Sequence, residues 1–162
     1  IGDYFINQFH KNNIATVIKH IPGHGLAKVD SHKSTPIVKS KLKNLNKIDF
    51  LAFKNKKSLF AMTAHIIYQD IDKKFTATHS KEVIKLIKNK IKFNNLLISD
   101  DISMKGLKFS IKENTIKAFN AGCDLVLHCN AKYGEMITVA KNSPKVNAFI
   151  TKKTSQFYKI LR

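Results

Sequence analysis

Four short apolar runs alternate with amphipathic segments along the chain, and this alternation restricts the possible folds more than any other feature. The runs cover residues 15–18, 58–63, 96–99 and 125–127. Parallel strands need long crossover connections and are covered on both faces, so they read as short, continuous apolar runs. The alternation therefore predicts an α/β fold built from βα units around a parallel sheet.

The first amphipathic segment begins close to the start of the chain. Asp3 is placed to cap a helix that ends near Lys11, with Tyr4, Phe5 and Phe9 as its apolar stripe. The sequence therefore predicts a short amphipathic helix ahead of the first strand.

Three longer segments also have helical spacing. Their apolar positions are Leu42, Leu45, Ile48 and Ala52 within residues 40–57, Val83, Ile84, Ile87 and Ile91 within residues 80–92, and Ile116 and Phe119 within residues 110–122. In the last segment, Ser110 and Glu113 form a capping-box pattern, and Gly122 is placed to end the helix. We expect each segment to form one helix.

Every predicted strand ends in a polar residue: His20, His65, Asp100 or His128. In a (β/α)8 TIM-type barrel the carboxyl ends of all strands form the catalytic rim, whereas an open doubly wound sheet gathers its ligand at one switch point. Four polar strand ends favour the barrel. A complete barrel needs roughly 250 residues, so these 162 residues, with about four βα units, correspond to half of one.

Half a barrel has two open strand edges. Such edges expose unpaired backbone groups and promote association. We therefore expect the chain by itself to be insoluble, dimeric or loosely folded.

The loop after the first strand concentrates polar side chains. The segment KHIPGHG places Lys19, His20 and His24 around Pro22 and two glycines, which favour a tight turn. Lys19 is a candidate cation for hydroxyl or carbonyl oxygens, or else a surface lysine whose stem lies along the strand end. His24 is either a site residue or a hydrogen-bonding group within the loop.

Asp30 and His32 follow in the same loop. In an extended segment, residues two apart share a face, so the carboxylate of Asp30 would reach the imidazole of His32. A carboxylate bound to one imidazole nitrogen raises the basicity of the other nitrogen, which then exchanges protons. The spacing is common, so the dyad is a hypothesis that depends on its position in a strand-end loop.

Asp100 and Asp101 close the third apolar run. Adjacent strand residues point in opposite directions, so at most one carboxylate faces the centre of the site. Asp100 is the candidate nucleophile, base or metal ligand. Asp101 is expected to cap the turn that follows.

Composition argues against several classes of function. The net charge of +18 suggests nucleic-acid binding, but Arg162 is the single arginine among 29 basic residues, and phosphate and base recognition favour arginine. A solvated lysine surface is the preferred interpretation.

No apolar run approaches the roughly 20 residues of a membrane span and no signal peptide is recognisable, so a cytoplasmic location is expected, although a missing amino terminus could have carried a signal. Cys123 and Cys129, at opposite ends of one strand, are expected to be reduced core residues.

Five motifs in this order and spacing resemble the family 3 glycoside hydrolases, and more narrowly the bacterial β-N-acetylhexosaminidases of cell-wall recycling. The motifs are KHIPGHG, DSHKSTP, MTAHIIYQDID, LLISDDISMKG and AGCDLVLHCN, and the similarity covers nearly all of residues 1–142. The resemblance implies that residues 1–162 form the C-terminal half of a single TIM-barrel catalytic domain. The missing N-terminal half would supply an aspartate and arginines that bind the sugar.

The resemblance also implies a reaction. It is the retaining hydrolysis of terminal, non-reducing β-N-acetylglucosamine from muropeptides, with no cofactor or metal ion. Asp100 matches the nucleophile that forms a covalent glycosyl-enzyme, His32 matches the acid/base and Asp30 its dyad partner.

Three further residues match substrate-binding positions of the family: Lys19, His20 and His65. The implied ligand is a small carbohydrate, with no nucleic acid or membrane partner. Because strands one to four of the barrel are absent, the activity of this chain alone is doubtful.

The glutamates are consistent with a histidine acid. Retaining glycosidases normally use two carboxylates, but Glu82, Glu113 and Glu135 all fall on predicted helices, away from the expected rim. A neutral histidine base repels an anionic acceptor less than a carboxylate does, so phosphorolysis is an open variant.

Three other classes of function are compatible with parts of the sequence. A metal-dependent barrel hydrolase with His20, His24, His65 and Asp100 as ligands is disfavoured. A basic nucleic-acid module and an inactive fragment complete the alternatives.

Overall fold

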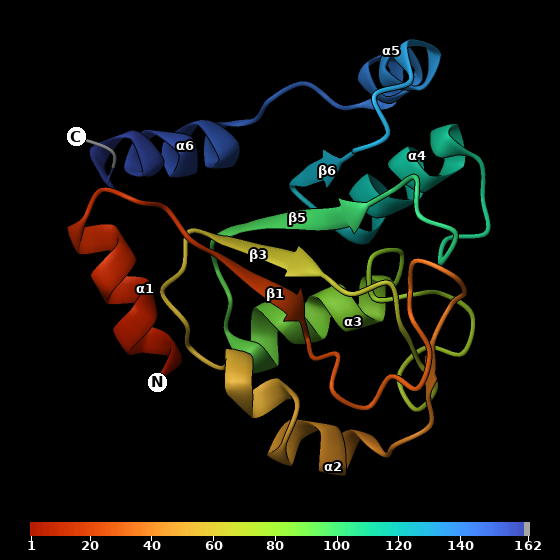
Figure 1. Ribbon diagram of the computed structural model, residues 1–162, viewed down its shortest axis with the longest axis horizontal. Coiled ribbons are helices and arrows are strands. Elements are labelled where there is room, and N and C mark those ends of the chain that lie inside the picture. Colours follow the sequence, from red (N-terminus) through yellow and green to blue (C-terminus); the bar gives the residue numbers. More distant parts are fainter. Residues whose placement is uncertain (161–162) are drawn as a thin grey trace.

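The computed structural model describes residues 1–160, which form a layered α/β arrangement (Figure 1). Its strands are β1 (Val17–Ile21), β2 (Ile37–Val38), β3 (Phe60–Thr63), β4 (Ile67–Tyr68), β5 (Leu96–Asp101) and β6 (Leu125–Leu127). Its helices are α1 (Gly2–Lys11), α2 (Leu42–Lys47), α3 (Lys81–Leu86), α4 (Ile111–Ala121), α5 (Tyr133–Asn142) and α6 (Ala148–Ile160). A 3-10 helix, η1 (Phe50–Phe53), follows α2, and a π-helical turn, η2 (Ile87–Ile91), continues α3.

Strands β1, β3, β5 and β6 form one sheet in that order, and every neighbouring pair is parallel. Phe60 of β3 pairs with Val17 of β1 and with Leu96 of β5. The carboxyl ends of the strands point to the right in Figure 1, where the long loops gather. Within those loops, β2 and β4 form a separate two-stranded parallel sheet. The α/β class and the parallel sheet predicted from the sequence are confirmed.

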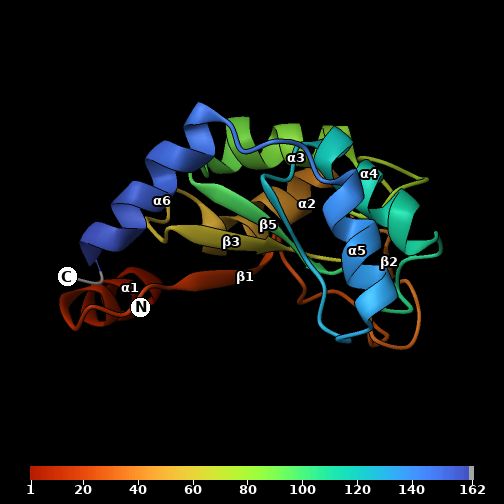
Figure 2. The same cartoon turned by 90° about the horizontal axis from the view of Figure 1, so that it is seen from above.

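The hydrophobic core lies between this sheet and a layer of helices. Helices α2, α3 and α4 lie on one side of the sheet (Figure 2). The core joins strand residues such as Ile21, Ala61 and Leu97 to the inner face of α3 and η2, which consists of Val83, Ile84, Ile87 and Ile91. These four were the predicted inner positions of that segment. Their burial is the main favourable contribution to folding here.

Two helix starts follow their sequence signals. Ser110 Oγ accepts the N–H of Glu113, and the Glu113 carboxylate accepts the N–H of Ser110, which completes the capping box of α4. Gly122 ends α4 in the left-handed conformation, with φ of 114°. Ser80 caps α3 by accepting the N–H of Val83.

The predicted Asp3 cap of α1 is wrong, and the predicted apolar stripe is largely exposed. The Asp3 carboxylate accepts a hydrogen bond from Lys56 Nζ at 2.7 Å and does not cap the helix. Its large aromatic residues Tyr4, Phe5 and Phe9 are 63%, 55% and 45% exposed. Ile6 is the buried residue of α1.

The single helix predicted for residues 40–57 is interrupted. It ends at Ile48, where φ and ψ are −120° and −75°, and resumes as η1. This break turns Phe50 into the core, where its ring meets that of Tyr68 edge-on at 5.8 Å. Ile48 itself is 72% exposed, so tertiary packing overrides the helical spacing.

Two further expectations are corrected, and one helix is added. β1 lies two to three residues later than predicted because its ladder is set by β3. Cys123 is buried as expected, but Cys129 is exposed; both are free thiols. Helix α6, which was not predicted, packs Phe157 against Phe60 with ring centroids 5.6 Å apart.

Over residues 1–160, every helix is too short or too polar to cross a bilayer.

Candidate active site

The carboxyl edge of the four-stranded sheet brings together the polar residues expected there. His20 lies near the end of β1, His65 two residues after β3, Asp100 within β5 and His128 directly after β6. Parallel pairing makes these strand ends neighbours (Figure 1). The edge is therefore the candidate active site.

Asp100 lies beside His20. Asp100 Oδ2 is 3.5 Å from His20 Nε2, and Asp100 Oδ1 accepts the N–H of Asp101 at 2.8 Å. The side chains of Asp100 and His20 are 14% and 26% exposed, respectively. A carboxylate has about four lone-pair sites, so Asp100 retains free acceptors for attack on a ligand.

His20 is held in its neutral form. Burial lowers the pKa of its imidazole, and the nearby Asp100 carboxylate only partly offsets this effect. The charges of His24, Lys19 and His65 lower the pKa of His20 further. At neutral pH this imidazole is therefore a hydrogen-bonding group and not a fixed cation.

His24 packs beside the imidazole of His20, and Lys19 precedes His20 in the strand. The ring centroids of His24 and His20 are 5.4 Å apart. Lys19 is exposed to solvent, and its charge is a minor cause of the lowered pKa of His20. His20 is thus the loop residue in contact with Asp100, with His24 packed behind it.

The predicted contact between the side chains of Asp30 and His32 is not formed. Residues 31–34 form a turn, not an extended segment, and Asp30 Oδ1 accepts the backbone N–H of His32 at 2.9 Å. Among the hydrogen bonds of residues 1–160, none joins the His32 imidazole to Asp30. The imidazole of His32 is exposed, because an Asp in this position favours a hydrogen bond to the backbone two residues on.

This turn is docked onto the loop after β5. Thr35 Oγ1 donates to the carbonyl of Gly106 at 2.6 Å. A Cβ on Gly106 would lie 2.5 Å from the carbonyl oxygen of Ser31 and 3.7 Å from His65 Cβ. Only glycine permits this approach, which holds the loop of His32 beside the strand ends.

His65 was predicted to contact substrate, but in the structure its imidazole forms hydrogen bonds within the protein. It is fully buried, with Nδ1 2.7 Å from Thr78 Oγ1 and Nε2 2.9 Å from the carbonyl of Asp101. Burial lowers the pKa of His65, so the ring is neutral. Both nitrogens are used within the protein, and this geometry does not support a sugar contact.

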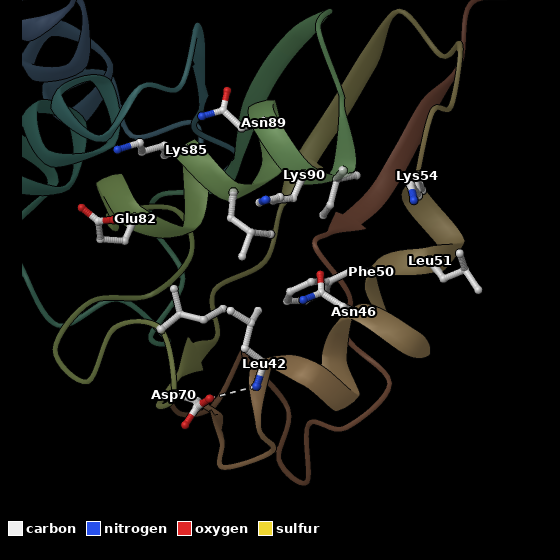
Figure 3. Close-up of a pocket in the computed structure, with 13 residues that line it drawn as sticks. Leu42, Asn46, Phe50, Leu51, Lys54, Asp70, Glu82, Lys85, Asn89 and Lys90 are labelled. Atoms are coloured by element: carbon white, nitrogen blue, oxygen red, sulfur yellow. Dashed lines mark hydrogen bonds between the residues drawn. The ribbon is translucent and has the colours of Figure 1, made fainter.

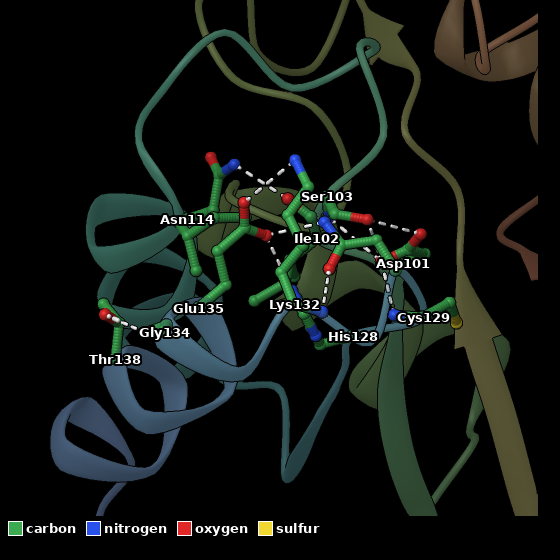
Figure 4. Close-up of polar contacts among 12 residues, drawn as sticks. Asp101, Ile102, Ser103, Asn114, His128, Cys129, Lys132, Gly134, Glu135 and Thr138 are labelled. Carbon is green, nitrogen blue, oxygen red and sulfur yellow. Dashed lines mark hydrogen bonds and ion pairs between the residues drawn. The ribbon is translucent and has the colours of Figure 1, made fainter.

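Asp101 caps the next turn, as expected. Its carboxylate accepts hydrogen bonds from the N–H and Oγ of Ser103 and from the N–H of Cys129 (Figure 4). The last contact joins the loop after β5 to the loop after β6. Asp101 therefore shapes the site through the backbone.

The structure adds a second contact between a histidine and a carboxylate, which sequence analysis missed. His128 Nε2 lies 2.8 Å from Glu135 Oε2, and Asn130 donates to the same oxygen at 2.6 Å (Figure 4). The hydrogen bond from His128 is the largest of the effects that lower the pKa of Glu135. Glu135 is therefore next to a strand end, and its predicted position away from the rim is wrong. The available signal was a polar strand end followed by an acid in the first turn of the next helix.

A well-formed cavity lies elsewhere in the molecule. It measures about 670 Å³ and lies between α2 and α3, with Leu42, Phe50 and Ile91 among its apolar lining and Lys54, Lys85 and Lys90 at its margin (Figure 3). None of the six predicted site residues lines it. Within residues 1–160, no three His, Cys, Asp or Glu side chains are grouped as ligands of one metal ion.

Parallel βα units with polar side chains at their carboxyl edge define a partial barrel of the enzyme type. The profile described as the glycosyl hydrolase family 3 N-terminal domain matches residues 1–156. The chain belongs to glycosyl hydrolase family 3. The resemblance inferred from the five motifs is therefore confirmed.

Individual relatives agree with this assignment. A β-hexosaminidase of Actinobacillus pleuropneumoniae serotype 5b is 36% identical over 140 residues, which cover 83% of this chain and 41% of that protein. The β-N-acetylglucosaminidase of Thermotoga maritima has a TM-score of 0.75 at 26% identity, covering 99% of this chain and 37% of its own.

The fold is confirmed by a more distant structure. A family 3 β-N-acetylglucosaminidase from Paenibacillus sp. has a TM-score of 0.83 at 22% identity, over 98% of this chain and 33% of its own. The sheet is thus part of a TIM-type barrel. The chain spans less than half the length of these relatives.

Proposed function

We propose that the parent protein, meaning the natural gene product that contains residues 1–162, is a retaining glycosidase. It would remove terminal, non-reducing β-N-acetylglucosamine from muropeptides that carry 1,6-anhydro-N-acetylmuramic acid, during cell-wall recycling in the cytoplasm. In this proposal residues 1–162 are the C-terminal half of one barrel, and the other half supplies further sugar contacts.

The observation that carries the proposal is the Asp100 carboxylate at the carboxyl end of β5, 3.5 Å from the neutral His20. Relatives of this chain are named β-hexosaminidases. Asp100 would attack the anomeric carbon while the bond to the leaving oxygen breaks. Protonated His32 would give its proton to that oxygen, and neutral His32 would then take a proton from the water that releases the sugar from Asp100.

The acid/base step needs a local rearrangement. Asp30 binds the backbone of His32 here, so a dyad with the imidazole requires residues 30–32 to change conformation when substrate binds. Lys19 and His20 would meet the hydroxyl groups of the sugar. In this assignment the acid/base His32 moves with its loop, whereas the nucleophile Asp100 stays in place on β5.

A matched pair of variants tests the nucleophile in the parent protein. Asp100→Asn should lower the cleavage rate of an aryl β-N-acetylglucosaminide on the order of 10⁴-fold or more, as removal of a nucleophile does. Asp3 lies on α1, remote in sequence from Asp100, so Asp3→Asn should leave the cleavage rate unchanged. Equal rates for both variants would refute the role of Asp100.

A second comparison tests His32. His32→Ala should slow substrates with poor leaving groups much more than activated aryl glycosides, because only the former need a proton. Equal losses on both kinds of substrate would remove His32 from the acid role. Formation of a sugar 1-phosphate when phosphate is added would show phosphorolysis instead of hydrolysis.

A further inference from the structure

One acidic side chain outside the predicted site lies directly against the glycine turn that follows His20. Asp49 comes after α2, at the break before η1. A Cβ on Gly23 would lie 2.6 Å from Asp49 Cβ, and a Cβ on Gly25 would lie 3.3 Å from Asp49 Oδ1. Asp49 therefore occupies the space that side chains at both glycine positions would need.

The carboxylate of Asp49 is incompletely paired. Its Oδ2 is buried and has no hydrogen-bond partner. Within residues 1–160, the backbone N–H groups of Gly23, His24 and Gly25 donate to no backbone carbonyl. A buried unpaired polar atom is costly and calls for an explanation. Within residues 1–160, no hydrogen bond joins Asp49 to the turn, so Asp49 supports the turn by close packing at Gly23 and Gly25.

The opposite side of the turn is fixed by Tyr68. Its hydroxyl donates to the carbonyl of Gly23, and its ring packs on Phe50, the residue after Asp49. Tyr68 is 1% exposed. Burial and the nearby charge of Asp49 raise the pKa of Tyr68, so its hydroxyl keeps its proton and remains a donor.

The turn is connected rigidly to the site. Only Ile21 and Pro22 separate His20 from Gly23, and Ile21 is fully buried in the core. A displacement of Gly23 is therefore transmitted to His20 and His24. We propose that Asp49 is a positioning residue, which holds the glycine turn against Tyr68 so that the His20 imidazole faces Asp100. The positional claim stands on these contacts; its catalytic consequence rests on the proposed glycosidase function.

The test follows His20 directly. The imidazole titrations of the parent protein are recorded by NMR for wild type, Asp49→Asn and the control Glu82→Gln, which removes an exposed carboxylate on α3. The charged groups that act most on the pKa of His20 are Asp100, His24, Lys19 and His65, not Asp49. A change in Asp49→Asn would thus report movement of the ring and not the lost charge.

In Asp49→Asn the midpoint of His20 should rise toward its ordinary value of about 6.5, because a loosened turn lets water reach the ring. The midpoint of His20 in Glu82→Gln should not move. An unchanged His20 in a folded Asp49→Asn would overturn the proposal. If Asp49→Asn does not fold, Tyr68→Phe and Gly25→Ala must shift His20 in the same direction; no shift in either would also overturn it.

Kinetics separate this inference from the proposed function. In an active parent protein, Asp49→Asn should lower kcat about tenfold or more for every leaving group while KM changes less, and Glu82→Gln should do neither. If no glycosidase activity exists but His20 still shifts, the proposed function fails and the positioning role stands. If activity exists and Asp49→Asn changes neither kcat nor His20, the positioning role fails alone.

Discussion

At the scale of single residues, Gly106 carries the closest contact between two site loops. A side chain there would meet the Ser31 carbonyl at 2.5 Å. Gly106→Ala should therefore destabilise the parent protein by about 1–3 kcal/mol and displace the loop of His32. Urea unfolding measures the stability.

Gly134 provides the control for that substitution. It lies in α5 with nothing within 4 Å of its added Cβ. Gly134→Ala should be neutral or stabilising by up to about 1 kcal/mol, because alanine favours the helix. Similar losses in the two variants would contradict the close approach at Gly106.

His79 predicts a pH dependence of stability. Burial lowers its pKa to about 4, so the unfolded chain binds a proton more readily than the folded one. The free energy of unfolding should then be highest above about pH 6.5 and fall by about 3 kcal/mol as the pH drops through about 4.

The variant His79→Phe isolates this contribution. Its ring can pack on Phe109, which lies 5.9 Å from the His79 ring. We expect the free energy of unfolding of wild type to fall relative to that of the variant by about 3 kcal/mol between pH 7 and pH 4. Parallel curves over that range would rule the His79 contribution out.

Local rules succeeded where the backbone conformation was correctly foreseen. Strand alternation separated Asp100 from Asp101, and the structure gives them different partners. The same reasoning failed for Asp30 and His32, because the segment is a turn whose backbone takes the carboxylate. Sequence could not reveal that Thr78 and the Asp101 carbonyl occupy both nitrogens of His65, since these contacts join distant segments.

At the scale of elements, the start of α4 depends on one hydroxyl. Ser110→Ala removes both hydrogen bonds of the Ser110 hydroxyl, to the Glu113 N–H and to its carboxylate, and should cost about 0.5–2 kcal/mol. Ser155→Ala, at an exposed position within α6, should change stability by only a few tenths of a kcal/mol. Thermal unfolding of both variants measures the two effects. Equal shifts of Tm would contradict the capping role of Ser110.

Helix prediction was reliable where capping signals and apolar spacing agreed, as in α3 and α4. It failed in residues 40–57, where the helical spacing of Leu42, Leu45 and Ile48 predicted one continuous helix but α2 ends at Lys47. The chain breaks there because Phe50 packs on Tyr68 and Asp49 supports the glycine turn. Both constraints come from other parts of the fold, so no local pattern contains them.

At the scale of the whole molecule, the sheet ends at β1 on one side and at β6 on the other. Exposed Val17 on β1 and Phe5 and Phe9 on α1 add apolar surface near the first edge. Residues 1–162 alone should therefore associate or unfold without cooperativity. Analytical ultracentrifugation and urea unfolding test this, and a monomer with a sharp two-state transition would contradict it.

The arrangement of strands was the most predictable property of the molecule. Apolar runs with polar ends required a parallel sheet, and β6 has the bounds expected for it. The pair of His128 and Glu135 was missed because it forms only when β6 and α5 are placed together.

The most direct test of the account is the identity of the covalent intermediate. The parent protein is incubated with a slow fluorinated β-N-acetylglucosaminide, and its intact mass and peptide map are recorded. The account predicts one added sugar on the peptide that contains Asp100, absent in Asp100→Asn. An active enzyme with no adduct, or with the sugar on another carboxylate such as Glu135, would contradict it.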